Sequence, residues 1–236
     1  KVCTDLSCHI AGAQRTLAAT KLQLATQPGC EIGTVSCLGR CDQAPAVAIN
    51  DSIYAGVTEQ RLETLLNAFL QGQVPDSSFI QQGSTTHAID PYDQPAERFS
   101  ILRNFLATQD VARVIQTLKD SGLRGMGGAG FPTGLKWEIV RNATGDQKYV
   151  VVNADESEPG TFKDRFLMEH FPYLLLEGIL LAAYVVGANQ AYIFLRHEYP
   201  HQEHVLEKAL TEARQSGLIG EKIQGSDFSC KVEIFV

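Results

Sequence analysis

Residues 1–71 carry the periodic apolar pattern of a small unit built from helices and strands. A helix is predicted over Ile10 to Leu24, a stretch of good helix formers that Pro28-Gly29 closes. The apolar positions of 47–54 flank Asn50-Asp51-Ser52, which predicts two strands joined by a tight turn. A second helix is predicted to begin after Thr58, because five apolar residues then follow at the spacing of one buried helical face: Leu62, Leu65, Leu66, Phe69 and Leu70.

The polar stretch 72–100 separates this unit from a second one, which we expect to span 101–236. The stretch is rich in Gln, Ser, Thr, Asp and Pro and has few periodic apolar positions, so it is predicted to be a linker. The second unit alternates helices and strands, an order that favours α/β layering. Helices are predicted over 110–121, 173–186 and 203–216, strands over 148–152 and 191–195, and a further alternating stretch runs from Phe228 to Ile234.

The composition excludes several classes of protein. Of the 236 residues, 44% are hydrophobic and 20% are charged, so the chain is expected to fold and not to be fibrous or disordered. Its net charge of -7 argues against a nucleic-acid-binding protein. The most apolar run, Tyr173 to Ala188, is shorter than the ~20 residues that cross a bilayer, so we expect a buried helix and no membrane span.

The cysteine content and the two ends of the sequence indicate the cellular compartment and the extent of the polypeptide. No secretory signal precedes the first cysteine, and six cysteines are few for a disulfide scaffold, so a reducing, cytoplasmic compartment is expected. Lys1 is not an initiator methionine, and the sequence stops at Val236 within an alternating apolar stretch. We therefore expect a piece of a longer polypeptide.

Four cysteines form two close pairs, Cys3 with Cys8 and Cys37 with Cys41. Thiolate sulfur is a soft ligand, and four thiolates can complete a 2Fe-2S cluster with two per iron or a tetrahedral zinc site. Disulfides fit poorly in a chain with no secretory signal, and thiols packed singly in a core have no reason to cluster. A metal centre is therefore predicted, and the cysteine count alone leaves iron–sulfur and zinc open.

The glycine-rich segment 125–130 satisfies the pattern G-x-G-x-x-G, but it follows a predicted helix and not a strand. The strand, turn and helix of a Rossmann unit are therefore not expected around it. Glycines still let backbone N–H groups approach a phosphate or a flat ring, and Lys136 could add a positive charge. A tight turn between domains is the alternative.

An amide and three carboxylates follow the predicted strand 148–152 at its carboxyl end, where α/β proteins usually bind ligands. These residues are Asn153, Asp155, Glu156 and Glu158. They could hold a metal such as Mg²⁺, bind the hydroxyl groups of a ribityl or ribose chain, or form a solvated loop.

The cysteine segments 2–8 and 37–46 resemble the thioredoxin-like 2Fe-2S ferredoxin domain, which forms the C-terminal half of the 24-kilodalton subunit of complex I type NADH dehydrogenases. The resemblance covers about residues 1–70. It implies that Cys3, Cys8, Cys37 and Cys41 are the ligands of a 2Fe-2S cluster. Cys30 and Cys230 have no counterpart in the family and are expected to be structural or incidental.

The segments 122–137, 153–165 and 192–199 resemble the 51-kilodalton FMN- and NADH-binding subunit, over about residues 110–236. The implied fold class is α/β, a thioredoxin-like 2Fe-2S ferredoxin domain followed by the start of a complex I 51-kilodalton-type FMN-binding α/β domain. The resemblance also implies a 4Fe-4S cluster, expected only in the part of the family that continues past Val236.

This second resemblance implies a role for each conspicuous residue. The loop 125–134 with Lys136 would wrap FMN and its phosphate, Phe131 would stack on the adenine of NADH, and Glu158 would face the nicotinamide as the catalytic residue. The implied cofactor-binding residues are Gly125, Gly127, Gly128, Ala129, Gly130, Phe131, Gly134, Lys136, Asn153, Asp155, Glu156 and Glu158.

A single chain joining these two domains resembles the electron-transfer subunit of soluble NAD-reducing complexes. FMN can accept a hydride from NAD(H) and release single electrons to iron–sulfur clusters. We predict such a subunit of an NAD-dependent formate dehydrogenase, partnered by a molybdenum or tungsten α subunit. The alternatives are the diaphorase subunit of an NAD-reducing hydrogenase with nickel–iron partner subunits, the flavoprotein of an NADH:quinone oxidoreductase, a non-catalytic iron–sulfur scaffold, and a zinc-stabilised binding module.

Overall fold

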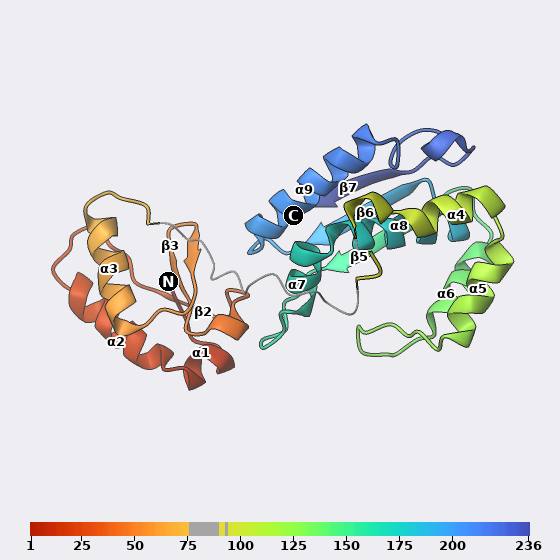
Figure 1. The fold of residues 1–236 in the computed structure, drawn as a ribbon. Coiled ribbons are helices and arrows are strands. Elements are labelled where there is room, and N and C mark those ends of the chain that lie inside the picture. Colours follow the sequence, from red (N-terminus) through yellow and green to blue (C-terminus); the bar gives the residue numbers. More distant parts are fainter. Residues whose placement is uncertain (76–89, 93) are drawn as a thin grey trace. The chain divides into compact units, whose positions relative to one another are not determined.

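The computed structural model describes residues 1–75, 90–92 and 94–236 (Figure 1). The chain divides into two compact units, and each is described by itself. One unit comprises Lys1–Thr85 with Glu156–Asp164, and the other comprises Thr86–Asp155 with Arg165–Val236. Most of the predicted 72–100 linker, residues 76–89 and 93, lies outside the described residues.

The first unit is built on a four-stranded sheet in the order β2-β1-β3-β4. β1 pairs in parallel with β2 and antiparallel with β3, and β3 and β4 form a hairpin. The strands are β1 Val2–Cys3, β2 Thr34–Val35, β3 Val47–Ile49 and β4 Ser52–Tyr54. The helices are α1 Leu6–Ile10, α2 Ala13–Leu24 and α3 Glu59–Leu70, with a short 3₁₀ helix η1 at Cys41–Gln43.

Local sequence signals account for most of this unit. Asn50 adopts a φ of 52° in the turn between β3 and β4, and the Thr58 hydroxyl accepts the Arg61 N–H at 3.2 Å at the start of α3. Both features confirm the predicted hairpin and helix cap. The predicted helix from Ile10 to Leu24 is observed as α2, but it begins three residues later, at Ala13, because Gly12, at a φ of 98°, separates it from α1. The apolar pattern does not predict α1.

The second unit contains a three-stranded, fully parallel sheet in the order β5-β6-β7. α8 packs against β5 and β6, and α9 packs against β7, which confirms the predicted α/β layering. The strands are β5 Tyr149–Ala154, β6 Gln190–Leu195 and β7 Lys231–Phe235. The helices are α4 Ser100–Thr108, α5 Val111–Asp120, α6 Thr133–Asn142, α7 Lys163–His170, α8 Pro172–Val186 and α9 Pro200–Gln215, with 3₁₀ helices η2 Pro95–Glu97 and η3 Ile223–Gly225.

The helix ends in this unit follow capping and proline chemistry. The Asp110 carboxylate accepts the Arg113 N–H at 3.0 Å and starts α5 where the sequence predicts it. α9 begins at Pro200, three residues before the predicted start, because proline is well tolerated in the first turn of a helix. The apolar pattern predicts neither α6 nor α7.

The apolar helix α8 is buried, as predicted, and it carries a buried carboxylate. Glu177 is 1% exposed, and its Oε1 accepts the Leu102 N–H of α4 at 2.8 Å. α4 has no side-chain bond from its own N-cap residue Phe99, so Glu177 supplies the acceptor from a neighbouring helix. Burial raises the pKa of this carboxyl.

Length and apolar composition decide whether a helix can cross a bilayer. Among these residues, no single helix is long and apolar enough to cross a bilayer. α7 and α8 would pass by length and composition only as a pair, and they are bent by 97° at the break between them.

Candidate functional site

Cys3 and Cys8 lie in the first unit at a strand-to-helix turn. Cys3 ends β1, and the Asp5 carboxylate accepts the Leu6 N–H at 2.6 Å, which starts α1 and brings Cys8 back toward Cys3. Both thiols are 1% exposed. A hydrogen bond between the two thiols lowers the pKa of Cys3 and raises that of Cys8, and burial raises the pKa of Cys8 further. The hydrogen bond therefore favours the charged form of the Cys3 thiol.

Cys37 and Cys41 form the second pair, with their sulfur atoms 3.5 Å apart. Gly39 lies between them at a φ of 66°, and its N–H donates to the Cys37 sulfur at 3.4 Å. The two pairs belong to one region, because the Cys3 thiol donates to Ser36 O at 3.1 Å, next to Cys37, and Cys41 contributes to raising the Cys8 pKa.

The arrangement in two pairs bears on the choice of metal. Within the described ranges, no three His, Cys, Asp or Glu side chains are arranged to hold a single metal ion. A structural zinc ion takes four ligands around one point, whereas a 2Fe-2S cluster takes two thiolates on each of two irons. Two pairs of cysteines, with the Gly39 N–H directed at the Cys37 sulfur and the Gly160 N–H at the Cys41 sulfur, fit the 2Fe-2S cluster.

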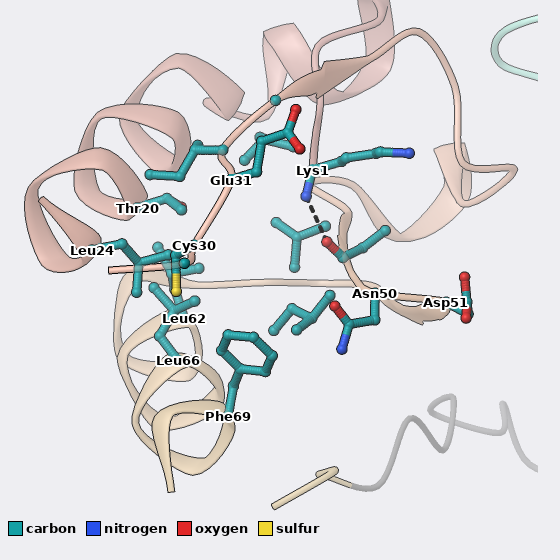
Figure 2. Close-up of a pocket in the computed structure, with 17 residues that line it drawn as sticks. Lys1, Thr20, Leu24, Cys30, Glu31, Asn50, Asp51, Leu62, Leu66 and Phe69 are labelled. Atoms are coloured by element: carbon teal, nitrogen blue, oxygen red, sulfur yellow. Dashed lines mark hydrogen bonds between the residues drawn. The ribbon is translucent and has the colours of Figure 1, made fainter. Parts of the chain in front are cut away.

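The remaining cysteines lie apart from this site. No disulfide joins any two of the six cysteines, all of which lie within the described residues. Cys230 is buried next to β7, and burial raises its pKa to about 11. Cys30 is half-buried and lines a cavity of about 710 Å³, which Figure 2 shows in the first unit.

That cavity is not lined by any of the predicted cluster or flavin residues. Leu24, Leu62, Leu66 and Phe69 form apolar walls, and Glu31, Asn50 and Asp51 lie at its polar rim (Figure 2). The dashed line in Figure 2 is the bond from the α-amino group of Lys1 to Ala48 O, 2.6 Å long.

In the second unit, the glycine-rich segment forms a closed loop between α5 and α6. Its base is fixed by two backbone bonds, Gly125 N–H to Phe131 O at 3.0 Å and Thr133 N–H to Leu123 O at 2.9 Å. The Arg124 guanidinium donates to Gly130 O at 2.9 Å, which joins the start of the loop to its end. As expected, a helix and not a strand precedes the segment, and α6, which the sequence did not predict, follows it. Sequence reasoning does not single out Arg124, because nothing there distinguishes it from other surface arginines.

The tip of this loop has the properties of an anion cradle. Within the described chain, the backbone N–H groups of residues 126–130 have no hydrogen-bond acceptor. Gly128 and Gly130 have φ values of 112° and 61°, which disfavour other residues, and no atom would lie within 4 Å of a Cβ at Gly127, Gly128 or Gly130. Unpaired N–H groups at an open, exposed loop are suited to a phosphate.

Gly134 is expected from the resemblance to bind cofactor, and the structure gives it a packing role. It is buried in the first turn of α6, and a Cβ there would lie 2.8 Å from the Lys119 backbone N and 3.0 Å from Ile115 O of α5. The ion pair from Lys119 to Glu138, at 2.7 Å, holds the same two helices together. Gly134 therefore allows α5 and α6 to approach closely.

Lys136 and Phe131 are both exposed near the loop. Lys136 lies in the first turn of α6, and Phe131 closes the base of the loop with 46% of its surface exposed. The exposed ring and ammonium group are accessible to a ligand.

The acidic segment is divided between the two units. Asn153 and Asp155 belong to the second unit, where the Asn153 side chain accepts the Asp155 N–H at 3.0 Å and turns the chain at the end of β5. Glu156 and Glu158 belong to the first unit. Glu156 is 1% exposed and accepts the Asp164 N–H at 2.9 Å, so it caps α7, while Glu158 is exposed.

The carboxyl end of β6 adds residues that sequence reasoning did not assign to the site. Arg196 is 6% exposed and donates to Glu198 at 2.8 Å, which lowers the pKa of Glu198. The backbone N–H of Arg196 donates to Ala154 O at 3.4 Å, so the ends of β5 and β6 are adjacent. This is the edge of a parallel sheet where ligands commonly bind.

Both units match known families. Residues 1–70 match the thioredoxin-like [2Fe-2S] ferredoxin, and residues 118–235 match the Nuo51 FMN-binding domain.

Three relatives illustrate the similarity. The alpha chain of the NAD-reducing hydrogenase HoxS of Cupriavidus necator is 35% identical over 84% of this chain and 36% of its own length. The F 2 chain of the NADH-quinone oxidoreductase of Rhizobium meliloti is 46% identical over 58% of this chain and 32% of its own. A crystal structure of an NAD⁺-reducing [NiFe]-hydrogenase in the H₂-reduced state superposes with a TM-score of 0.78 and 31% identity, over 99% of this chain and 42% of that one. The chain thus spans roughly a third of the length of these curated relatives.

Proposed function

Because this chain belongs to the family of Nuo51-type FMN-binding domains, with a thioredoxin-like [2Fe-2S] ferredoxin domain before it, we propose that it is an electron-transfer subunit of an NAD(H)-linked oxidoreductase. The observation that carries the proposal is the presence in one chain of two kinds of site. One is a buried set of paired cysteines, and the other is an exposed glycine loop with unpaired N–H groups. FMN supplies the exchange between hydride transfer and single-electron transfer.

The residues of the first site would hold the cluster. Cys3 and Cys8 would bind one iron, and Cys37 and Cys41 the other, since the sulfur atoms are already paired in this way. The buried position of three of these four cysteines limits the access of water to the sulfur atoms. The Gly39 N–H directed at Cys37 would stabilise negative charge on that sulfur.

The residues of the second site would bind the nucleotides. The N–H groups of 126–130 and the Lys136 ammonium group would bind the FMN phosphate, and Asn153 and Asp155 would bind polar groups of the flavin. Phe131 would stack on the adenine of NADH, and the exposed Glu158 would face the nicotinamide. The resemblance assigns Glu156 and Gly134 to the cofactor as well. In this chain Glu156 also accepts the Asp164 N–H, and Gly134 also allows α6 to pack closely on α5.

We propose that formate is the terminal substrate and that a molybdenum or tungsten partner subunit oxidises it in the cytoplasm. The second candidate is hydrogen, oxidised by nickel–iron partner subunits, and the match to the HoxS alpha chain over 84% of this chain favours it. Isolation of the complex with its partners distinguishes them. Formate-driven NAD⁺ reduction with molybdenum or tungsten in the complex supports the first candidate, and hydrogen-driven reduction with nickel supports the second.

The function itself is tested on the same isolated complex. We expect this chain to carry FMN and acid-labile sulfide, and NADH to reduce an artificial acceptor through it. A complex with cluster signals but no flavin would favour a non-catalytic iron–sulfur subunit. A colourless chain containing zinc would overturn the proposal.

A further inference from the structure

Arg40 is a buried cation within the cluster-binding loop. It lies between Cys37 and Cys41 in the sequence, it is 1% exposed, and it is among the largest fully buried side chains of the described chain. A guanidinium group remains charged at every pH at which proteins fold. Burial of such a group is tolerated where it is hydrogen-bonded, and Arg40 is bonded to its own loop.

The geometry holds the guanidinium group against its own loop. Its Nη1 donates to Gly39 O at 3.1 Å, and the Gly39 N–H in turn donates to the Cys37 sulfur at 3.4 Å. Through these two contacts the positive charge lies within roughly 10 Å of the Cys37 sulfur. All four residues from Cys37 to Arg40 are buried, so little water separates the charge from the cysteine ligands.

We propose that Arg40 is a positioning residue that makes the 2Fe-2S cluster easier to reduce. Reduction adds one electron to the cluster, and the cluster with its four thiolates becomes one unit more negative. A fixed buried cation stabilises the reduced form more than the oxidised form. This inference rests on the proposed function, since it requires the cluster to be bound by the four cysteines.

The size of the effect follows from the separation. Coulomb's law with an effective dielectric constant of about 20 over roughly 10 Å gives about a fifteenfold change in the equilibrium constant for reduction. For a one-electron couple, at 59 mV per tenfold change, this corresponds to a midpoint potential lower by about 70 mV when the charge is removed. Salt screens a buried charge much less than an exposed one.

The test is a redox titration of the isolated complex, with the electron paramagnetic resonance signal of the reduced 2Fe-2S cluster as the readout. Arg40→Gln removes the charge and keeps much of the side-chain volume, and Arg40→Lys keeps the charge. Arg15→Gln is the matched control, because Arg15 is an exposed arginine of the same unit. We expect Arg40→Gln to lower the equilibrium constant for reduction at least about tenfold, and both other variants to change it by less than about threefold.

The outcomes separate this inference from the proposed function. A wild-type chain without any 2Fe-2S signal overturns both. Two outcomes with an intact 2Fe-2S signal overturn the role of Arg40 alone. In the first, the midpoint potential of Arg40→Gln equals that of Arg15→Gln. In the second, the potential of Arg40→Lys is shifted as far as that of Arg40→Gln. If Arg40→Gln does not assemble the cluster, Arg40→Lys decides. A cluster with nearly the wild-type potential supports the role of charge, and loss of the cluster in this variant too assigns Arg40 to packing.

Discussion

Gly134 is predicted to be required for packing of α6 on α5. In Gly134→Ala, the new Cβ would lie 2.8 Å from the Lys119 backbone N, 2.9 Å from Lys119 Cγ and 3.0 Å from Ile115 O. Two of these three atoms belong to the backbone of α5, so relief requires one helix to move. Overpacking of this kind costs about 1–3 kcal/mol, and the better helix propensity of alanine returns at most about 1 kcal/mol.

The three contacts at or below 3.0 Å place the cost in the upper part of that range, about 2–3 kcal/mol. After a return of about 1 kcal/mol the net loss is about 1–2 kcal/mol, which corresponds to a fall in Tm of roughly 2–8 °C for a domain of this size. Trp137 gives a local assay, because it is the sole tryptophan of the chain, lies in α6 and packs against the apolar cluster around Phe105 and Ile115. Thermal unfolding of the flavin-free protein is followed by its fluorescence.

Gly127→Ala is the matched control for this substitution. No atom lies within 4 Å of a Cβ at Gly127, and its φ is not in the left-handed region, so we expect its Tm to equal that of the wild type. An unchanged Tm in Gly134→Ala, combined with loss of FMN binding, would refute the packing argument and assign Gly134 to the cofactor site alone.

Three other substitutions test the remaining assignments. Cys8→Ser should abolish or reshape the 2Fe-2S electron paramagnetic resonance signal while Cys230→Ser leaves it unchanged, and equal effects would contradict the ligand assignment. Glu158→Gln should alter NADH turnover more than FMN content, which steady-state kinetics and flavin analysis measure together; unchanged kinetics would remove Glu158 from the site. Burial raises the pKa of Glu177, so the folded chain binds this proton more tightly than the unfolded chain, and stability should fall as pH rises from the ordinary glutamate pKa, about 4.3, through the raised value. Denaturant titrations should show a flatter profile for Glu177→Gln, and identical profiles would contradict the assignment.

The elements that could be predicted from the sequence are those set by local signals. α3 and α5 begin at the predicted residues because Thr58 and Asp110 cap them, and a regular apolar face follows each cap. α6 was not predicted because it follows the glycine loop directly, begins after Pro132 and contains Gly134 in its first turn. These residues are poor helix formers, and tertiary packing on α5 outweighs their low propensity.

In the candidate sites too, only the features set by local sequence spacing could be predicted. The spacing of the four cysteines predicts that they converge, and the structure brings their sulfur atoms into neighbouring pairs. The burial of Glu156 at the start of α7, and that of Arg40 in the cluster loop, depend on contacts that have no periodic signature in the sequence. A glutamate within an acidic run and an arginine within a loop would ordinarily be expected to be exposed.

The two sites are built in opposite ways, and the chemistry of their ligands explains the difference. A cluster is bound through the side chains of the protein itself, and its charge changes by one unit, so buried ligands and a nearby fixed charge act on its potential. Burial accordingly covers Cys3, Cys8, Cys37 and Arg40. A nucleotide phosphate arrives from solvent already charged, and it is bound by donors that have no other partner. The exposed loop 126–130 accordingly leaves its backbone N–H groups unpaired within the described chain. Filling the loop with side chains should therefore impair nucleotide binding without unfolding the chain, whereas neutralising Arg40 should change a potential without releasing the cluster.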